Sequence, residues 1–183
     1  MDLANSAKDV EKVLVTQEQI LTRLKEIARQ VEKDYEGKDL LLIGVLKGAV
    51  MAVADFSRVL NRHIDMDWMA VSSYGSGTKS SGVVRILKDL DSDITNRNVI
   101  IVEDIVDTGL TLSWLKANLE SRGAKSVEIL TILRKPDAAK VKVEVKYVGF
   151  DIPTDFVVGY GLDYDEKYRN LDYVGVLAKE IYS

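Results

Sequence analysis

The chain has 183 residues, of which 46% are hydrophobic and 30% charged, a formal net charge of −4 and no cysteine. This length suits one α/β domain with a full core. The negative net charge argues against a general nucleic-acid-binding protein. The lack of cysteine excludes disulfides, thiolate zinc sites and thiol catalysis. Because no apolar run approaches the roughly 18 residues that span a bilayer and no signal-peptide pattern is visible, we expect a cytoplasmic protein that binds neither membrane nor nucleic acid.

The first third of the chain predicts strand, helix, strand and helix in turn. Residues 1–9 are expected to be loosely held, and alternating charged and apolar residues in 10–15 predict a short strand. Thr16 begins a capping-box pattern, and the apolar residues after it fall at helical spacing. Residues 40–45 are typical of a buried strand, and a second apolar helix is expected to end near Leu60.

Two features of this region carry polar residues whose role stays open. Lys47 and Gly48 lie between the second strand and the second helix. On residue type alone, a tight turn with a solvated lysine explains them as well as a ligand site does. His63 is the only histidine, and it has no Ser, Cys or second His partner at a recognisable spacing, so we interpret it as structural.

An antiparallel arm with an unusual loop comes next. Residues 65–73 and 83–87 predict its two strands. The segment 73–82 between them reads SYGSGTKSSG and holds three glycines and four serines. A segment of this composition buries too little apolar surface to be ordered by itself, which favours a flexible hairpin loop. The alternative interpretation is a lid that closes over a ligand and excludes water.

The most informative stretch is 99–111, which reads VIIVEDIVDTGLT. Its first four β-branched residues are typical of a parallel strand buried on both faces. Glu103, Asp104 and Asp107 then follow within five positions. Because ligands of open α/β sheets bind at the carboxyl ends of the strands, we expect these acids to come at the end of the strand and to face a ligand rather than the core.

Thr108, Gly109 and Thr111 follow the acids and precede a predicted helix. Glycine lets the backbone approach a ligand closely, and a helix N-terminus offers unpaired N–H groups and a positive dipole end to a phosphate. A phosphate cradle beside carboxylates suggests a ribose phosphate, with its phosphate on the amides and its hydroxyls on the acids. A surface turn would explain the DTG string alone, but the full run favours a ligand site.

The rest of the chain predicts further strands with basic and aromatic residues near their ends. Residues 126–133 predict a strand, and Arg134 and Lys135 follow at its carboxyl end, so this basic pair is expected to point towards the ligand. Taken alone, the pair would indicate a solvated turn. Residues 145–150 predict another strand. The segment 156–164, FVVGYGLDY, suits a flat aromatic ligand read by backbone groups, and equally an ordinary strand and turn.

Two of these segments resemble a known family. The 99–111 run resembles the phosphoribosyl pyrophosphate (PRPP) motif of the type I phosphoribosyltransferases. FVVGYGLDY, with Arg169 six residues after Asp163, resembles the base-binding segment of the hypoxanthine-guanine phosphoribosyltransferases, and the match covers roughly residues 40–170 in five motifs in the same order. The resemblance implies transfer of the 5-phosphoribosyl group from PRPP to N9 of hypoxanthine or guanine, giving IMP or GMP and pyrophosphate.

The resemblance also implies the architecture. We expect one phosphoribosyltransferase domain over 1–183, an α/β fold with a central, mostly parallel sheet flanked by helices, a small hood built from the chain ends and a flexible lid loop. The lid would be 73–82, since Ser73 and Tyr74 match the start of the family's mobile loop over pyrophosphate, and the base-binding hood segment would be 145–183. Because family members are usually dimers or tetramers, a homodimer or homotetramer is expected.

Site residues are carried over by the same resemblance. The 5′-phosphate cradle would be Asp107, Thr108, Gly109, Leu110 and Thr111. Glu103 and Asp104 would hold the ribose hydroxyls. The pyrophosphate contacts would be Lys47, Gly48, Ser73, Tyr74 and Arg169. The purine contacts would be Lys135 at O6, Phe156 on the ring face, and the backbones of Val157 and Asp163 at the ring edge.

Mg²⁺ is the implied cofactor, because the pyrophosphate leaving group carries several charges and hard cations take oxygen ligands. Asp163 is expected to ligate one ion on the pyrophosphate. Glu103 and Asp104 are expected to organise another ion indirectly, through the ribose hydroxyls. Asp107 is the expected general base, facing N7 of the purine.

Two positions depart from the family pattern, and two other functions stay open. Leu110 stands where some relatives carry lysine and Ala49 where some carry a second glycine; neither change removes a backbone N–H, so binding should change more than chemistry. One alternative is a sister enzyme for xanthine, adenine or a pyrimidine, although Lys135 favours 6-oxopurines. The other is a regulatory protein that kept the fold but binds nucleotide and RNA, for which this acidic chain lacks a basic face.

Overall fold

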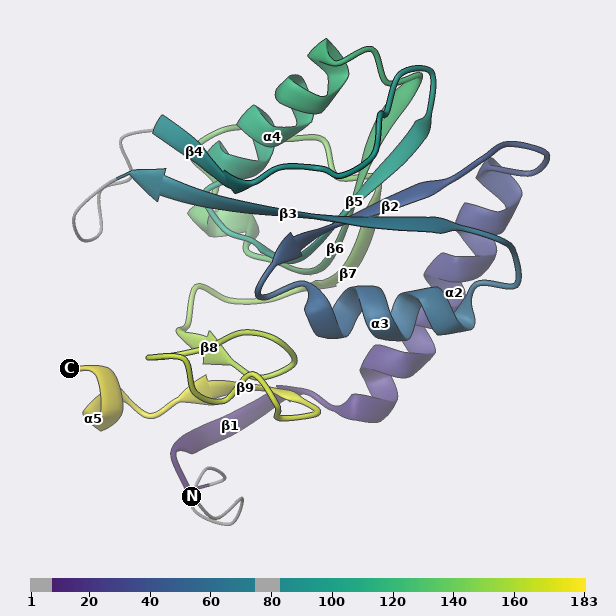
Figure 1. Ribbon diagram of the computed structural model, residues 1–183. Helices are drawn as coiled ribbons and strands as arrows, with labels where there is room; N and C mark the ends of the chain where they lie inside the picture. Colours follow the sequence, from purple (N-terminus) through teal and green to yellow (C-terminus); the bar gives the residue numbers. More distant parts are fainter. Residues whose placement is uncertain (1–7, 75–82) are drawn as a thin grey trace.

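A six-stranded sheet and a separate three-stranded sheet organise the fold (Figure 1). This computed structural model describes residues 8–74 and 83–183. The large sheet has the order β4-β3-β2-β5-β6-β7, with β2 (Leu41–Leu46), β3 (Asp65–Tyr74), β4 (Val83–Lys88), β5 (Asn98–Val106), β6 (Ser126–Arg134) and β7 (Tyr147–Asp151). β4 runs antiparallel to β3, and the other neighbours run parallel. The predicted, mostly parallel α/β sheet is thereby confirmed.

Helices cover both faces of the large sheet. α2 (Gln17–Asp34) and α3 (Val50–Val59) pack on one face, and α4 (Leu110–Ser121) packs on the other (Figure 1). The predicted capping box begins α2, since the N–H of Gln19 donates to Thr16 Oγ1 at 3.3 Å and the N–H of Thr16 donates to Gln19 Oε1 at 2.8 Å. Two short helices are also present in the described part of the chain, η1 (Pro136–Ala138) and α5 (Lys179–Tyr182).

Strands β2 and β5 lie at the centre of the core because alternate residues pack against different helix layers. Leu42 and Ile100 belong to the cluster that includes α2 and α3, whereas Leu41, Ile43 and Ile101 belong to the cluster that includes α4. All five are fully buried. Burying one such side chain contributes about 1.5–3 kcal/mol, so strands with apolar residues on both faces are stable only between two helix layers.

The small sheet, which we call the hood, is built from both chain ends, as predicted. Its antiparallel order is β1-β9-β8, with β1 (Val10–Val15), β9 (Val174–Leu177) and β8 (Val157–Val158). The predicted hood segment 145–183 begins too early, because β7 pairs in parallel with β6 in the large sheet. The reason is packing, since the apolar body of Tyr147 is buried in the main core.

The predicted lid and the predicted loose start of the chain lie mostly outside the described residues, so both stay predictions. The first two residues of the lid segment, Ser73 and Tyr74, continue the backbone of β3 and pair with β4. The antiparallel arm therefore extends as far as the described residues on both strands. Among these residues, no helix is long and apolar enough to cross a membrane.

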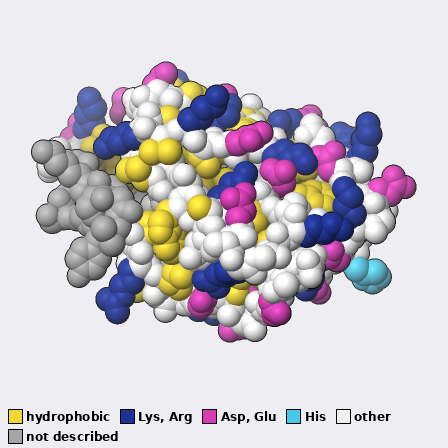
Figure 2. Space-filling model, turned by 90° about the horizontal axis from the view of Figure 1, so that it is seen from above, with side chains coloured by type: hydrophobic (Ala, Val, Ile, Leu, Met, Phe, Trp, Pro, Cys, Tyr) yellow, Lys and Arg dark blue, Asp and Glu magenta, His cyan; other side chains and the backbone are white. Residues whose placement is uncertain are grey.

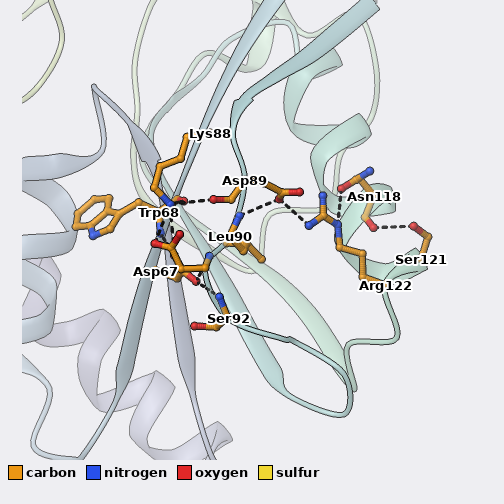
Figure 3. Close-up of polar contacts among 10 residues, drawn as sticks. Asp67, Trp68, Lys88, Asp89, Leu90, Ser92, Asn118, Ser121 and Arg122 are labelled. Atoms are coloured by element: carbon orange, nitrogen blue, oxygen red, sulfur yellow. Dashed lines mark hydrogen bonds and ion pairs between the residues drawn. The ribbon is translucent and has the colours of Figure 1, made fainter.

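A polar network ties the β3-β4 arm to α4 (Figure 3). The buried carboxylate of Asp67 accepts hydrogen bonds from the N–H groups of Asp91 at 3.0 Å and Ser92 at 2.9 Å. Burial alone raises the pKa of Asp67, but the backbone donors around it bring that pKa below its usual value. Arg122, the C-cap of α4, then donates to Asp89 at 2.6 Å. The network fixes the arm against the helix that begins at the predicted phosphate cradle.

The opposite end of the large sheet is also hollowed, and the side chain of Arg97 there is paired with two acids. A cavity of about 530 Å³ lies where β2, β3 and β5 begin, and the exposed His63 lines it. Arg97 of the same cavity donates to Asp39 and to Asp65, each at 2.6 Å. Acidic and basic side chains are interspersed in the same way over the face drawn in Figure 2. We therefore keep the structural interpretation of His63.

Candidate active site

Glu103 and Asp104 lie inside strand β5 rather than after it. The strand runs to Val106 because its backbone continues to pair with β6, with Glu103 opposite Thr131 and Val106 opposite Arg134. The acids were predicted at the end of the strand, and the strand continues two residues beyond Asp104. Both carboxylates lie on the same cavity at this end of the sheet.

The acids, the turn after β5 and the loop after β2 line one cavity. Its volume is about 290 Å³, and it lies at the carboxyl ends of β2 and β5. The predicted site residues that line it are Gly48, Glu103, Asp104, Asp107, Thr108, Gly109 and Thr111. Sequence reasoning predicted that carboxylates and a phosphate cradle would face the same ligand, and the structure brings them to one space.

Both acids are half-buried, and their carboxylates have too little compensating charge nearby. Burial, and then the charge of Asp104, raise the pKa of Glu103 well above its usual value, and Glu103 Oε2 is a buried oxygen without a hydrogen-bond partner among the described residues. Burial also raises the pKa of Asp104 to about 6, although the N–H of Ile105 and the charge of Arg169 act in the opposite direction. Because unpaired buried carboxylate oxygens are costly, this pair is suited to accept hydrogen bonds from a polar ligand.

We expect Asp104→Asn to stabilise the ligand-free protein at high pH. Since folding raises the pKa of Asp104 from 3.8 to about 6, the folded state binds this proton more tightly, and the native protein loses stability as the pH rises through that interval. One pKa unit corresponds to about 1.4 kcal/mol, so the variant should gain about 1–3 kcal/mol near pH 8 and little near pH 4. Urea unfolding at both pH values measures the gain.

The exposed control Asp155→Asn should show no pH-dependent gain. If Asp104→Asn were as stable as the native protein at both pH values, burial of the charged Asp104 carboxylate would not destabilise the folded protein.

The turn after β5 leads directly into α4, whose N-terminus has no side-chain cap. Gly109 is the N-cap, with a φ of +78°, and a Cβ there would lie 2.8 Å from the carbonyl oxygen of Val141. The N–H of Val141 in turn donates to the carbonyl of Thr108 at 3.2 Å. Leu110 is the first helical residue, so its N–H is one of those that lack a helical partner. Such N–H groups at the start of a helix form a site for a phosphate.

Asp107 lies between two cavities. It is exposed, and it lines both the 290 Å³ cavity and a smaller one of about 160 Å³ that Lys135 also lines. Lys135 is only 8% exposed, and its N–H donates to the carbonyl of Val106 at 2.9 Å, which fixes it beside the end of β5. Arg134 still belongs to β6, and its guanidinium pairs with Asp151 of β7 at 2.7 Å. Arg134 lines the smaller cavity together with Lys135, but its guanidinium is already paired with an acid, so its contact with a ligand stays a prediction.

Phe156 belongs to a cluster of three aromatic rings. It stacks on Tyr182 with ring centroids 4.9 Å apart, and it meets Tyr164 edge-on at 5.8 Å. Phe156 is 39% exposed, so part of its ring surface is available to a flat ligand. Its neighbour Val157 is buried in β8. Sequence reasoning did not single out Tyr182, because nothing in the pattern of the last helix links it to a segment so far back in the chain.

Four charged residues from two distant segments meet beside the loop after β2. Lys47 Nζ lies 2.9 Å from Glu166 Oε2. Arg169 Nη2 lies 3.3 Å from Glu166 Oε1 and 2.9 Å from Asp163 Oδ1. Lys47 and Arg169, both predicted to contact pyrophosphate, are thus brought together with Glu166 between them. Sequence reasoning missed Glu166, since an acidic residue in a polar turn carries no local signal.

Gly48 is enclosed by β5 on one side and by the base-binding segment on the other. A Cβ on Gly48 would lie 1.6 Å from Asp104 Oδ2. Gly161, whose φ is +98°, contacts the same loop so closely that its own Cβ would lie 1.9 Å from the carbonyl oxygen of Gly48. Neither glycine can carry a side chain unless its neighbour moves.

The oxygen donors present fit a Mg²⁺ ion that is shared with a substrate. Within 8–74 and 83–183, no three His, Cys, Asp or Glu side chains form a metal cluster by themselves. Mg²⁺ commonly takes only one or two carboxylates and completes its shell with water and substrate phosphates. The unpartnered Oε2 of Glu103, and Asp163, whose charge raises the pKa of the nearby Asp104, supply carboxylates of this kind.

Two of the predicted pyrophosphate contacts are not tested by this geometry. The side chains of Ser73 and Tyr74 lie outside the described part of the structure. Their contact with pyrophosphate therefore stays a prediction.

The chain is similar to known proteins over most of its length. A model of the phosphoribosyl transferase domain matches residues 12–165. The chain is 58% identical over 180 residues to the hypoxanthine-guanine phosphoribosyltransferase of Mycobacterium tuberculosis, covering 95% of this chain and 89% of that protein. It is 54% identical over 176 residues to the enzyme of the same name from Streptococcus thermophilus, covering 96% and 98%.

A solved structure gives the same result. The crystal structure of a hypoxanthine phosphoribosyltransferase from Staphylococcus aureus matches with a TM-score of 0.96 and 48% identity, over 100% of both chains. Sequence and structure thus agree over nearly the whole chain. The chain belongs to the phosphoribosyltransferase family and, within it, to the hypoxanthine-guanine phosphoribosyltransferases.

Proposed function

We propose that this protein transfers the 5-phosphoribosyl group of PRPP to N9 of hypoxanthine or guanine, which yields IMP or GMP and releases pyrophosphate. One observation carries the proposal: a single cavity joins the buried, unpartnered oxygen of Glu103 to the uncapped N-terminus of α4. The oxygen lacks a hydrogen-bond donor, and the N–H groups of the helix N-terminus lack an acceptor. A sugar phosphate supplies both, because its hydroxyls donate to the acids and its phosphate accepts from the N–H groups.

The ribose phosphate is held at the end of β5. The backbone N–H groups of 107–111 and the hydroxyls of Thr108 and Thr111 bind the 5′-phosphate. The ribose hydroxyls donate to Glu103 and Asp104, and these hydrogen bonds offset the cost of burying two carboxylates. What supports this assignment is that all these residues except Leu110 line the same cavity.

The purine lies beside the smaller cavity. Lys135 donates to the purine O6, Phe156 stacks on the ring face, and the backbones of Val157 and Asp163 bind the ring edge. The burial of Lys135 and its backbone hydrogen bond to Val106 support a fixed donor at this point. Because the 6-amino group of adenine offers no acceptor to a lysine, this contact selects 6-oxopurines.

Asp107 takes the proton that the purine loses. In the reaction, the bond from N9 to C1′ of the ribose forms, the bond from C1′ to the pyrophosphate oxygen breaks, and the proton on N7 passes to the carboxylate of Asp107. The position of Asp107 between the two cavities supports this role. A general base of this kind contributes about a hundredfold to ten-thousandfold in rate.

The pyrophosphate leaving group needs positive charge. When bound, Mg²⁺ supplies it as a hard cation on the phosphate oxygens. Asp163 would hold this ion directly, and Glu103 and Asp104 would act on a second ion through the ribose hydroxyls. Lys47 and Arg169 add two protein cations to the same group.

We also propose that the enzyme works in the cytoplasm as a homodimer or homotetramer. Its substrates and products, among them PRPP, IMP and GMP, are phosphorylated metabolites, and the family members are usually oligomers. Size-exclusion chromatography with light scattering measures the oligomeric state.

An absorbance assay with PRPP, Mg²⁺ and one base at a time tests the reaction. We expect turnover with hypoxanthine and guanine, little with adenine or uracil, and loss of turnover with a chelator. Xanthine is included to rank the 6-oxopurines. Turnover with adenine or a pyrimidine alone would contradict the role given to Lys135, and no turnover with any base would contradict the proposed function.

A further inference from the structure

Glu166 lies between the two protein cations that the proposed function assigns to pyrophosphate. Its Oε2 is 2.9 Å from Lys47 Nζ and its Oε1 is 3.3 Å from Arg169 Nη2, so each carboxylate oxygen faces one cation. The backbone holds Glu166 in this position, because its N–H donates to Asp163 Oδ2 at 3.0 Å. Its φ of +58° is a conformation that residues other than glycine adopt rarely.

We propose that Glu166 is an internal competitor of pyrophosphate. Its carboxylate holds Lys47 and Arg169 when no diphosphate is bound, and it gives them up when PRPP or pyrophosphate arrives. The inference rests on the proposed function, since it takes these two cations as pyrophosphate contacts. Glu166 is a positioning residue here, because it acts on the substrate through the cations and not by contact with the reacting atoms.

Competition follows from what the two anions share. A carboxylate and a pyrophosphate group accept hydrogen bonds from the same N–H donors, and each disfavours the other by like-charge repulsion. Lys47 and Glu166 have side chains that are each 65% exposed, so their ion pair is weak. A ligand with several negative charges can therefore displace the carboxylate from Lys47.

Arg169 differs from Lys47 in how firmly it is held. Its side chain is 23% exposed, and besides Glu166 it binds Asp163 Oδ1 and the carbonyl oxygen of Gly161, both at 2.9 Å. Arg169 thus stays in place when Glu166 leaves, whereas Lys47 is free to turn to the ligand. When pyrophosphate dissociates, the carboxylate pairs again with both cations, and this competition lowers the net affinity for the product.

The variant Glu166→Gln tests the proposal, because glutamine keeps the size of the side chain and removes its charge. In steady-state assays of IMP formation, we expect the inhibition constant of pyrophosphate to fall about threefold to tenfold, as for loss of exposed ion pairs. The KM for PRPP should fall in the same direction, and the KM for hypoxanthine should not change. Added salt should reduce the difference from the native protein, since exposed charges are screened.

Two controls separate competition from a general change of charge. Asp165→Asn removes one negative charge at the neighbouring position, where the carboxylate pairs with Lys167 at 3.1 Å, and it should leave the inhibition constant unchanged. Glu166→Gln in a Lys47→Gln background should give a smaller gain than in the native background, because one of the two cations is then missing.

The direction of the effect decides the question. Weaker inhibition by pyrophosphate in Glu166→Gln would mean that the carboxylate supports the two cations, and unchanged inhibition would mean that it has no influence on them; either result overturns the proposal. If the native protein does not turn over PRPP with any purine, the proposed function fails and this inference fails with it. Normal turnover with unchanged inhibition overturns the inference alone.

Discussion

Gly48→Ala is expected to lower kcat/KM for PRPP by at least about a hundredfold while the protein stays folded. The added methyl group would lie 1.6 Å from Asp104 Oδ2, far inside any non-bonded contact. The loop has little room to retreat, because the carbonyl of Gly48 is in close contact with Gly161 on its other side. The carboxylate of Asp104 is the end of a side chain, so it is the group that moves, and the ribose hydroxyls lose one of their acceptors.

Steady-state kinetics with varied PRPP, together with thermal unfolding, separates this effect from simple destabilisation. Gly37→Ala is the control, because no atom lies within 4 Å of the added Cβ, although the φ of Gly37, unlike that of Gly48, is left-handed at +68°. It should lose about 1 kcal/mol of stability through backbone strain and keep its activity. A Gly48→Ala protein that uses PRPP within a few fold of the native rate would show that Asp104 is not needed where the structure places it.

Asp107→Asn is expected to lower kcat by about a hundredfold to ten-thousandfold. Asparagine has the same shape but cannot take up the proton from the purine. The 5′-phosphate is bound mainly by backbone N–H groups of the same turn, which the substitution leaves in place, so the KM for PRPP should change only a few fold. The measurement is kcat and the KM for PRPP with hypoxanthine in excess.

The control for this variant is Asp137→Asn, an exposed aspartate of η1 that does not line either cavity among the described residues. It should behave like the native protein. Equal kcat values for Asp107→Asn and the native protein would remove Asp107 from the role of general base, and a large rise in KM with constant kcat would make it a binding residue instead.

Local sequence patterns were enough for the elements that carry the phosphate end of the site. The β-branched run of β5 has to be buried on both faces, the glycine of the turn has a left-handed φ, and the leucines of α4 fall on one helix face. Each of these features depends on residues close together in the chain, so the sequence predicts them well. The small hood from both chain ends was predicted from family resemblance and not from these patterns.

Features that depend on long-range pairing were predicted less well. Acidic residues normally mark the end of a strand, but backbone pairing with β6 carries β5 through Glu103 and Asp104. The ion pair between Arg134 and Asp151 was not predicted, because it depends on how β6 and β7 pair. The contact between Lys47 and Glu166 joins residues 119 positions apart, and no local pattern encodes such a pair.

The buried acids illustrate a conflict between stability and function. Glu103 and Asp104 have raised pKa values because they are buried with too few partners, and a neutral side chain at either position would suit the ligand-free fold better. The presence of both carboxylates is explained if a ligand supplies the missing donors. Stability and substrate use should therefore change in opposite directions when either charge is removed.

A crystal structure with bound IMP tests most directly whether a ribose phosphate binds at the end of β5. We predict that the 5′-phosphate accepts hydrogen bonds from the N–H groups at the start of α4 and that the ribose hydroxyls donate to Glu103 and Asp104. A nucleotide bound elsewhere, for example in the cavity that His63 lines, with the end of β5 left empty, would contradict the site and the reaction proposed for it.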